Sequence, residues 1–424
     1  MNMENKIAFY LDKENLNNQD YSRITEGNPG IGGSEYEFLL VSYLLEQRKN
    51  GITSILLTRN KLKFPHSNIQ YVKSIDDACN FCLTHNIFLL VINQTQFDKK
   101  ILDPYGTKLS FILWAHNTMP YSKLSLFSQL TYIKRIVCCG REMLDLYRDH
   151  IATLKSTYIY NIFPTKEKDW YLNKISHEDN HNVAYMGCLT PEKGFHVLAR
   201  AWKDILKKVP DAQLYVIGSG QLYNKMAVGE YGLAEKNYEK YFMSYLKDEN
   251  GNLLPSVHFM GLMGIEKFEV LAKCKVGVPN PTGKTECLPI TTIEMQLMGC
   301  KITTIKHPAY LDTVFNSKNL YKKTSELCDF ITKSLLSSKD DSYDDVYQFI
   351  TNKFNTESNI QRWEQMIQNI DTFPLENYSE KPYQMKKIKN LLLQLKLRIP
   401  IFNHFPPIEK FYNFFLNRIL KYNS

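Results

Sequence analysis

The sequence predicts an α/β protein built from two domains, each with a parallel sheet. Short apolar runs alternate with amphipathic or polar segments along most of the chain, which is the pattern of strands joined by crossover helices. The length of 424 residues exceeds what one domain usually holds. The strand pattern also restarts after a polar run, 166–180, that has the composition of a linker. We therefore expect a first domain over 1–165 and a second domain over 181–355.

A glycine-rich turn separates the first predicted strand, 6–11, from the first predicted helix. Gly32 and Gly33 precede a helical pattern whose apolar face is formed by Tyr36, Leu39, Leu40, Tyr43 and Leu44. Ser34 and Glu37 have the spacing of a capping box, which gives Ser34 a structural role without any ligand. Glycines at such a turn let the backbone approach a ligand closely, so the turn is a candidate binding element.

His116 directly follows the predicted strand 110–115. Ligands of parallel sheets bind beyond the carboxyl ends of the strands, and His116 falls at such an end. An isolated histidine is also common as a surface residue without a function. Both interpretations of His116 stay open at this point.

The stretch 276–299 carries the most informative pattern in the second half. An apolar run predicts a short buried strand, a loop follows, and a helical pattern begins near Pro289, where a first helical position suits proline. The start of a helix presents unpaired N–H groups and a partial positive charge, which favours a phosphate. Glu286 lies in the loop and Glu294 about one and a half turns inside the helix, so the two carboxylates can reach opposite ends of one extended ligand. The competing explanation is that the helix dipole alone favours a Glu near a helix start.

These features resemble those of retaining glycosyltransferases of family 4, which take a sugar from a nucleotide. The stretch from Glu286 to Glu294 resembles the E-x7-E signature of that family. The run GCLTPEKGFHVLARAW, which follows a predicted strand at 183–186, resembles the start of its donor domain. Asn161 resembles the asparagine that opens its interdomain linker, although Ile162 stands where the family usually has Gly.

The resemblance extends over 7–370 and implies a GT-B fold, in which two Rossmann-like parallel-sheet domains face a cleft. The second domain then binds the donor and the first domain binds the acceptor. A helical segment at 356–372, which contains Trp363, resembles the element that returns from the second domain to the first.

The resemblance also implies a role for each motif. Glu286 then meets the hydroxyls of the donor sugar, Glu294 meets the ribose diol, and His116 lies near the reacting sugar. Lys193 is the compact positive charge at the diphosphate, whereas its structural alternative is a solvated turn. The predicted catalytic residues are therefore His116 and Glu286. The predicted donor-binding residues are Gly32, Gly33, Lys193, Lys284, Leu288, Pro289, Ile290 and Glu294.

The sequence departs from the family pattern at Cys188. Family members commonly have Gly-Arg-Leu where this chain has Gly187, Cys188 and Leu189, so a diphosphate-binding arginine is missing. A neutral thiol makes no ion pair with phosphate, and the loss of a charge-assisted hydrogen bond costs roughly 1.5–3 kcal/mol. Lys284 is our candidate for a replacement cation, since its neighbour Gly283 allows a close approach.

The activity that the resemblance implies is that of a retaining hexosyl- or N-acetylhexosaminyltransferase. We expect a nucleotide-sugar donor, with a UDP-sugar favoured, and no metal or other cofactor, since helix N-termini and lysine would stabilise phosphate charge. The expected acceptor is a hydroxyl of a glycan or of a lipid-linked saccharide, in bacterial surface polysaccharide or lipopolysaccharide synthesis. Two alternatives remain: a GT-B phosphorylase or nucleotide-sugar epimerase, and a nucleotide-sugar-binding or regulatory protein with an impaired site.

The net charge of +8 is concentrated in residues 381–424 of the tail, 373–424. Residues 381–424 hold nine Lys and Arg against one Glu, so the remainder of the chain is balanced. The tail predicts two basic amphipathic helices that suit an anionic membrane surface. Packing on the protein's own body is the alternative, and nucleic-acid binding is not expected because aromatic residues occupy the apolar face. The first predicted stripe is Ile388, Leu391, Leu392, Leu395 and Ile399, and the second is Ile408, Phe411, Tyr412, Phe415, Leu416 and Ile419.

The cellular location is predicted from what the sequence lacks. No uncharged apolar run approaches the roughly 18 residues of a membrane span, and the N-terminal segment has no signal-peptide core. The nine cysteines show no framework spacing, and the pair Cys79 and Cys82 has no second pair at zinc spacing, which favours reduced thiols. We therefore expect a cytoplasmic protein that is peripheral on the inner face of the membrane.

Overall fold

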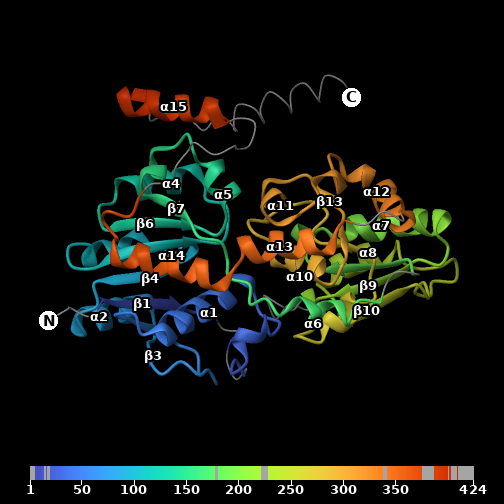
Figure 1. Cartoon of the computed structure of the whole chain (residues 1–424), viewed down its shortest axis with the longest axis horizontal. Coiled ribbons are helices and arrows are strands. Elements are labelled where there is room, and N and C mark those ends of the chain that lie inside the picture. The colour runs from blue at the N-terminus through green and yellow to red at the C-terminus, as the bar shows by residue number, and fades with distance from the viewer. Residues whose placement is uncertain are drawn as a thin grey trace.

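The computed structural model describes residues 5–13, 16, 20–176, 180–220, 228–337, 341–374, 386–399, 401–402 and 408. They form two α/β domains side by side and a helical C-terminal region, as Figure 1 shows. The predicted fold class, two parallel-sheet domains, is therefore confirmed. None of the helices in the described part of the chain is long and apolar enough to cross a membrane.

The first domain is built on a seven-stranded parallel sheet with the order β3-β2-β1-β4-β5-β6-β7. Its inner strands are continuous apolar runs because helices cover both faces of the sheet. The strands are β1 (Asn5–Leu11), β2 (Ile52–Thr58), β3 (Ile69–Tyr71), β4 (Leu89–Asn93), β5 (Ser110–Ala115), β6 (Ile133–Cys138) and β7 (Ser156–Tyr158). The helices are α1 (Gly33–Arg48), α2 (Ile75–Thr84), α3 (Lys99–Leu102), α4 (Tyr121–Gln129) and α5 (Arg141–Leu146).

The second domain has a five-stranded parallel sheet with the order β10-β9-β8-β11-β12 and a small two-stranded sheet, β13-β14. The strands are β8 (Asn182–Met186), β9 (Gln213–Ile217), β10 (Val257–Gly261), β11 (Val276–Val278), β12 (Lys301–Ile302), β13 (Thr304–Ile305) and β14 (Leu320–Tyr321). The helices are α7 (Phe195–Lys208), α8 (Lys236–Met243), α9 (Lys267–Leu271), α10 (Ile290–Leu297), α11 (Pro308–Thr313), α12 (Leu327–Leu336) and α13 (Tyr343–Lys353). The predicted linker contains a short helix of its own, α6 (Lys168–Leu172).

Helix α14 (Thr356–Gln368) carries the chain back from the second domain to the first. Its Trp363 is fully buried, with ring centroids 4.6 Å from Trp114 on β5 and 6.1 Å from Phe9 on β1. Arg48 at the end of α1 forms an ion pair of 2.7 Å with Glu364 on α14. The second domain is thus connected to the first through both the linker and this helix.

Asp312 on α11 joins the two domains on the side of α5. Its carboxylate accepts the backbone N–H of Glu142 at 2.7 Å and the hydroxyl of Tyr160 at 2.8 Å, both from the first domain. Lys353 balances the charge with an ion pair of 3.1 Å. Burial and the nearby Asp312 carboxylate raise the pKa of Glu142 to about 7. This contact fixes the spacing of the two sheets whose ends face the cleft.

The predicted capping box of α1 is wrong. The helix begins at Gly33, so Ser34 lies inside it, and the residue before the helix, Gly32, makes no side-chain cap. The Ser34 hydroxyl donates to Glu35 at 2.9 Å instead. Glu37 is fully buried and accepts the N–H of Ile162 at 3.0 Å, and burial raises the pKa of this carboxyl well above its usual range. Glu37 therefore ties α1 to the segment that leaves the first domain.

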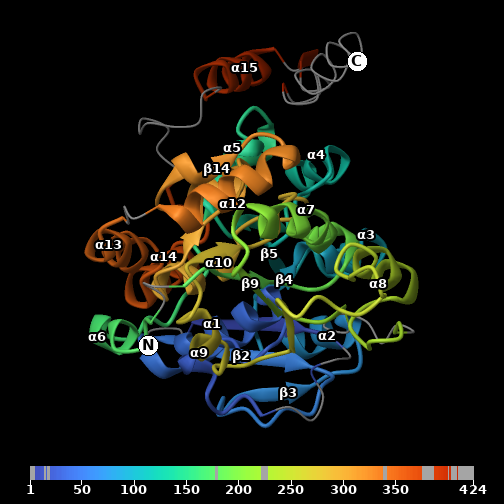
Figure 2. The ribbon, with the colours of Figure 1, turned by 90° about the vertical axis from the view of Figure 1, so that its right-hand side faces the viewer.

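The tail contributes one helix, α15 (Lys386–Arg398), which lies beyond α4 and α5 in both Figure 1 and Figure 2. The second predicted tail helix falls outside the described residues except for Ile408. All nine cysteines are free thiols, and eight of them are buried, Cys79 and Cys82 included.

Candidate active site

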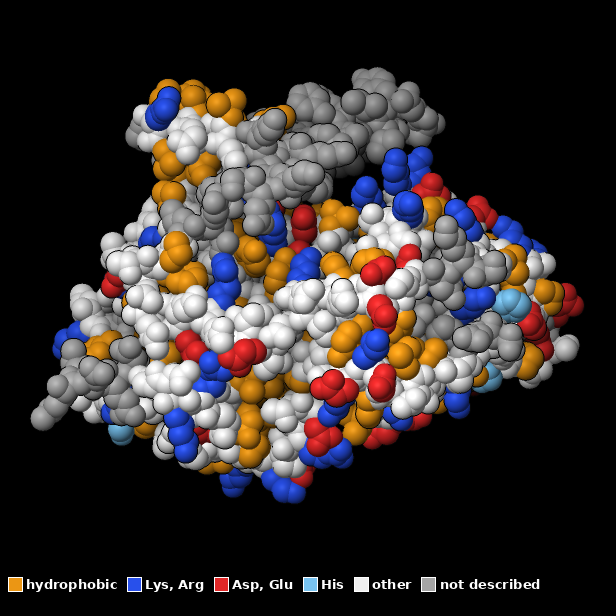
Figure 3. All heavy atoms as spheres, in the orientation of Figure 1, with side chains coloured by type: hydrophobic (Ala, Val, Ile, Leu, Met, Phe, Trp, Pro, Cys, Tyr) orange, Lys and Arg blue, Asp and Glu red, His pale blue; other side chains and the backbone are white. Residues whose placement is uncertain are grey.

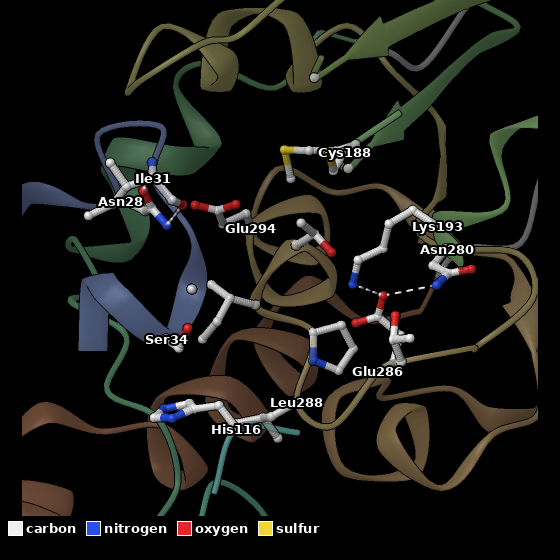
Figure 4. A pocket seen from close by; sticks show the side chains of 18 of the residues that line it. Asn28, Ile31, Ser34, His116, Cys188, Lys193, Asn280, Glu286, Leu288 and Glu294 are labelled. Atoms are coloured by element: carbon white, nitrogen blue, oxygen red, sulfur yellow. Dashed lines mark hydrogen bonds and ion pairs between the residues drawn. The ribbon is translucent and has the colours of Figure 1, made fainter. Parts of the chain in front are cut away.

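A cavity of about 630 Å³ lies between the two domains, where the carboxyl ends of both sheets meet. Parallel sheets bind ligands at this edge, and a cavity of this volume holds a molecule the size of a nucleotide. The first domain contributes the loop before α1 and the residues that follow β5 and β6. The second domain contributes the loops after β8, β9 and β10 and the start of α10. Figure 4 shows the side chains that converge there.

The loop between β11 and α10 is held in one shape by Asn280. The side-chain amide of this residue donates to the carbonyl of Lys284 at 2.7 Å, to the carbonyl of Glu192 at 3.0 Å and to Glu286 at 3.1 Å. Gly283 has a φ of 67°, and a Cβ there would lie 2.9 Å from His307, so this tight turn requires glycine. The loop thereby places Glu286 at the cavity rather than in solvent.

Helix α10 begins at the cavity. Its first residue is Ile290 and its N-cap is Pro289, so the helix starts one position later than predicted, and Leu288, Pro289 and Ile290 all line the cavity. The helix holds Glu294, which lines the same cavity. The structure therefore brings both glutamates of the sequence motif, and the helix start between them, into one site.

Glu286 forms an ion pair of 2.7 Å with Lys193, and both side chains retain some contact with solvent, with exposed fractions of 11% and 22%. Lys193 ends a short 3-10 turn, Pro191–Lys193, which is followed by Gly194 at a φ of 69°. A Cβ at Gly194 would lie 2.6 Å from Thr282, so only glycine allows this turn to lie on the loop that holds Glu286. The solvated-turn interpretation of Lys193 is thus replaced by a defined partner in the cavity.

Glu294 forms a second ion pair, 2.6 Å from Lys267 on α9. These two side chains are nearly inaccessible, with exposed fractions of 4% and 6%. The amine of Lys267 also lies 3.5 Å from the carbonyl oxygen of Asn28 in the first domain. The sequence analysis missed Lys267. The signal was a lysine one turn before the buried Leu271, on a helix face that is otherwise apolar.

The glycine-rich turn of the first domain approaches the second domain closely. The side-chain oxygen of Asn28 accepts the N–H groups of Gly30 and Ile31, each at 2.9 Å, and this bends the loop toward the cavity. Gly30 has a φ of 95°, and a Cβ there would lie 3.4 Å from the carbonyl of Met263. Gly33 lines the cavity, whereas Gly32 is not among the described residues that line it.

His116 lies at the end of β5 among the residues that line the cavity, and Figure 4 shows its ring below Ser34. Neither of its ring nitrogens has a hydrogen-bond partner among the described residues. Its ring lies 4.6 Å from the ring of Trp114 and 6.0 Å from that of Phe38, centroid to centroid. Burial lowers the pKa of His116 to about 3, so the imidazole is neutral near pH 7 and presents one donor and one acceptor.

The sequence raised two points about the donor phosphates, the thiol at Cys188 and a replacement cation at Lys284, and the structure places these two side chains differently. Cys188 lines the cavity, and its thiol lies 3.2 Å from the carbonyl oxygen of Ser219. Lys284 is exposed, and it is not among the described residues that line the cavity, because its loop turns the backbone rather than the side chain inward. The buried cation that the structure places in the cavity is Lys267.

Comparison with known proteins relates part of the second half of the chain to a protein family. Residues 180–321 match the model of the family described as glycosyl transferases group 1. The matched stretch covers most of the second domain, which is therefore similar to the domains of that family. The matched stretch includes Lys193, Lys267, Glu286 and Glu294, and so it contains both ion pairs of the cavity.

A curated relative, an uncharacterized glycosyltransferase from Haemophilus influenzae, is 26% identical over 119 residues. The match spans 27% of this chain and about a third, 33%, of the relative's length. It supports the similarity to glycosyltransferases without extending it to the whole chain.

Solved structures resemble nearly the whole described fold. A glycosyltransferase from Rickettsia africae has a TM-score of 0.63 at 11% identity, covering 88% of this chain and 100% of that one. Sucrose-phosphate synthase from Thermosynechococcus elongatus has a TM-score of 0.61 at 13% identity, covering 86% and 98%. The catalytic domain of starch synthase IV from Arabidopsis thaliana, solved with ADP and acarbose, has a TM-score of 0.55 at 10% identity, covering 87% and 99%. At these identities the likeness concerns the fold, so the two domains that flank the cleft have the arrangement of the GT-B fold.

Proposed function

We propose that this protein is a retaining glycosyltransferase that moves a sugar from a nucleotide sugar to a hydroxyl group. The observation that carries the proposal is the convergence of Glu286, Glu294 and the start of α10 on one cavity between the domains. The match to the group 1 glycosyltransferase family supports the proposal, because the matched residues 180–321 contain both glutamates and the start of α10.

In the proposed donor complex, the two glutamates bind hydroxyl groups of different parts of the donor. Ionised carboxylates accept strong hydrogen bonds from hydroxyls. Glu294, deep in the cavity, is assigned to the ribose diol, and Glu286, nearer the opening, to the hydroxyls of the transferred sugar. Their lysine partners reduce the repulsion between these carboxylates and the donor phosphates.

The proposed catalytic contribution is stabilisation of the leaving diphosphate. Its charge is met by the Lys193 amine and by the backbone N–H groups at the start of α10, beside Leu288, Pro289 and Ile290. The backbone of Gly33 approaches the same region from the first domain. His116 is proposed to hold the reacting sugar through a neutral imidazole, which accepts a hydrogen bond from a sugar hydroxyl without a change of charge. The proposal requires no metal ion.

The finer proposals follow the family resemblance. We favour a UDP-sugar donor, with transfer of a hexosyl or N-acetylhexosaminyl group to a glycan or lipid-linked acceptor in bacterial surface polysaccharide synthesis. The second candidate, a nucleotide-sugar-binding protein with an impaired site, is favoured by Cys188 alone, since a thiol cannot neutralise phosphate.

The experiment measures release of free nucleotide from a panel of UDP-, GDP- and ADP-sugars with candidate glycan acceptors. Thermal shift with the free nucleotides identifies which nucleotide the protein binds before acceptors are tried. The anomeric proton couplings of the product then test whether the configuration is retained. Glu286→Ala is the control, since it removes the carboxylate assigned to the donor sugar. Nucleotide binding without turnover on any acceptor would support the impaired-site candidate, whereas release only with phosphate as acceptor would indicate a phosphorylase.

A further inference from the structure

Helix α15 presents several apolar side chains to solvent and two of its lysines, Lys389 and Lys396, to the body. Lys389, Leu393 and Lys396 are buried, with Lys389 1% and Lys396 3% exposed. The spacing of these three residues places them on one face of the helix. The opposite face holds four exposed aliphatic residues, which we call the outward row: Ile388, Leu391, Leu395 and Ile399.

Contacts with the first domain fix this orientation. The Lys389 amine donates to the carbonyl oxygens of Asp145 at 2.9 Å and Leu146 at 3.2 Å. These carbonyls belong to the last turn of α5, where no further helical N–H groups follow to pair with them. The Lys396 amine lies 5.8 Å from the ring centroid of Tyr121 at the start of α4. Lys389 thus attaches the helix to the body, whereas the Lys396 amine has no hydrogen-bond partner among the described residues. The outward row points away because of that attachment.

This arrangement is the reverse of a surface helix, which ordinarily buries its apolar face. Leu391 is 71% exposed, and Figure 3 shows hydrophobic side chains gathered over α15 at one edge of the molecule. A contiguous exposed apolar row indicates an interaction surface rather than scattered exposure.

We propose that the outward row of α15 inserts into the interface of an anionic lipid bilayer. The charge of the tail indicates an anionic membrane as the binding partner. Helix α15 has no acidic residue, it exposes Arg398 beside the row, and the segment 381–424 that contains it carries nine Lys and Arg against one Glu. Aliphatic side chains bordered by basic residues match the boundary between acyl chains and anionic headgroups.

The geometry refines the prediction for the tail. The sequence placed Lys389 and Lys396 largely off the apolar stripe and left packing on the protein's own body as the alternative; both lysines are buried against the first domain. Binding therefore depends on insertion of aliphatic side chains more than on lysine attraction. Because α15 is attached to the first domain, docking brings the proposed acceptor domain to the lipid surface. This last step rests on the proposed function, but the docking itself does not.

The test is flotation of the full chain with vesicles of phosphatidylglycerol and phosphatidylcholine, compared with vesicles of phosphatidylcholine alone. The full chain is expected to float with the anionic vesicles. The variant Leu391→Gln with Leu395→Gln is expected to lower the vesicle partition coefficient at least about tenfold, because two inserting side chains become polar. Both positions are exposed, so its thermal unfolding and nucleotide binding should equal those of the wild type.

The matched control is Leu397→Gln, the same change at an exposed leucine outside the outward row. This control is expected to float like the wild type. Lipid docking is overturned if the full chain floats with neither vesicle, and the assignment to the outward row is overturned if the double variant floats unchanged. If the wild type forms dimers that the double variant abolishes, the row binds a second copy of the chain instead. A chain that floats but transfers no sugar retains this inference and overturns the proposed function.

Discussion

The two ion pairs of the cleft use the same residue types but lie in different surroundings. Lys193 and Glu286 belong to loops at the cavity opening and remain partly accessible. Lys267 and Glu294 belong to helices, are almost completely buried, and lie against the Asn28 carbonyl of the other domain. Charges at the opening can exchange a protein partner for a ligand at little cost, whereas buried charges have no water to replace a lost partner.

The difference indicates two separate tasks. The pair at the opening is suited to groups that change during a reaction, such as a leaving phosphate and a transferred sugar. The buried pair is suited to a part of the ligand that stays bound, and it connects that part to both domains. The sharpest test of this difference is therefore to make the same substitution in each ion pair and to compare the effects.

Loss of the Lys267 charge is expected to have the largest effect. Lys267→Met leaves Glu294 buried without a cation and should destabilise the protein by about 3–5 kcal/mol. The matched variant Lys193→Met, at the opening, should cost about 1 kcal/mol or less. Urea unfolding of both variants measures the difference. Adding Glu294→Gln to Lys267→Met should recover most of the loss, and equal destabilisation by the two single lysine variants would show that burial does not distinguish the pairs.

The two glutamates should separate binding from transfer. Glu294→Ala is expected to raise the nucleotide Kd by roughly ten- to a hundred-fold, the equivalent of one charge-assisted hydrogen bond. Glu286→Ala should leave nucleotide affinity nearly unchanged and lower the rate of transfer. Isothermal titration and nucleotide release measure the two quantities. Glu294→Gln is the control, because it removes the same charge beside Lys267 but keeps the size of the side chain. Wild-type nucleotide affinity in both Glu294 variants would make the ribose assignment wrong.

The Cys188 site tests whether a second cation beside Lys193 would strengthen donor binding. Cys188→Arg is expected to tighten donor binding by up to about tenfold, because a guanidinium can pair with the diphosphate where the thiol cannot. Isothermal titration with the donor measures this, with Cys188→Ser as the neutral control. An unfolded or inactive arginine variant would show instead that the pocket is built around the small buried thiol and its contact with Ser219.

The sequence predicted the sheets better than the contacts between side chains. Strand β5 is a continuous apolar run, and this local pattern was sufficient to place it and the His116 that follows. Glu286 and Glu294 were predicted from their spacing and the helix start between them. The partner of Glu294 was missed because Lys267 lies on a helix of five residues, too short for its buried face to show as a pattern.

Two other differences have physical causes that no local pattern contains. The capping box failed because α1 begins at Gly33, two residues earlier than a cap at Ser34 requires. The orientation of α15 depends on carbonyl groups at the end of α5, more than two hundred residues earlier in the chain, so the apolar stripe alone predicted the helix but not the face that packs.

The smallest expected effect is that of His116 on the pH dependence of stability. This side chain extends the comparison of the two ion pairs, since it is an ionisable group that burial keeps neutral. Burial lowers its pKa from 6.5 to about 3, so below pH 6.5 the unfolded chain binds a proton that the folded protein does not. Stability from this group is therefore fully present above pH 6.5 and declines as the pH falls toward 3, by about 1 kcal/mol between pH 7 and pH 5.5. Urea unfolding at both pH values, compared between wild type and His116→Gln, isolates this contribution because the other titrating groups, Glu142 included, remain in both proteins. The wild type should lose about 1 kcal/mol more than the variant, and identical pH dependence would show that the imidazole titrates normally in an open cavity.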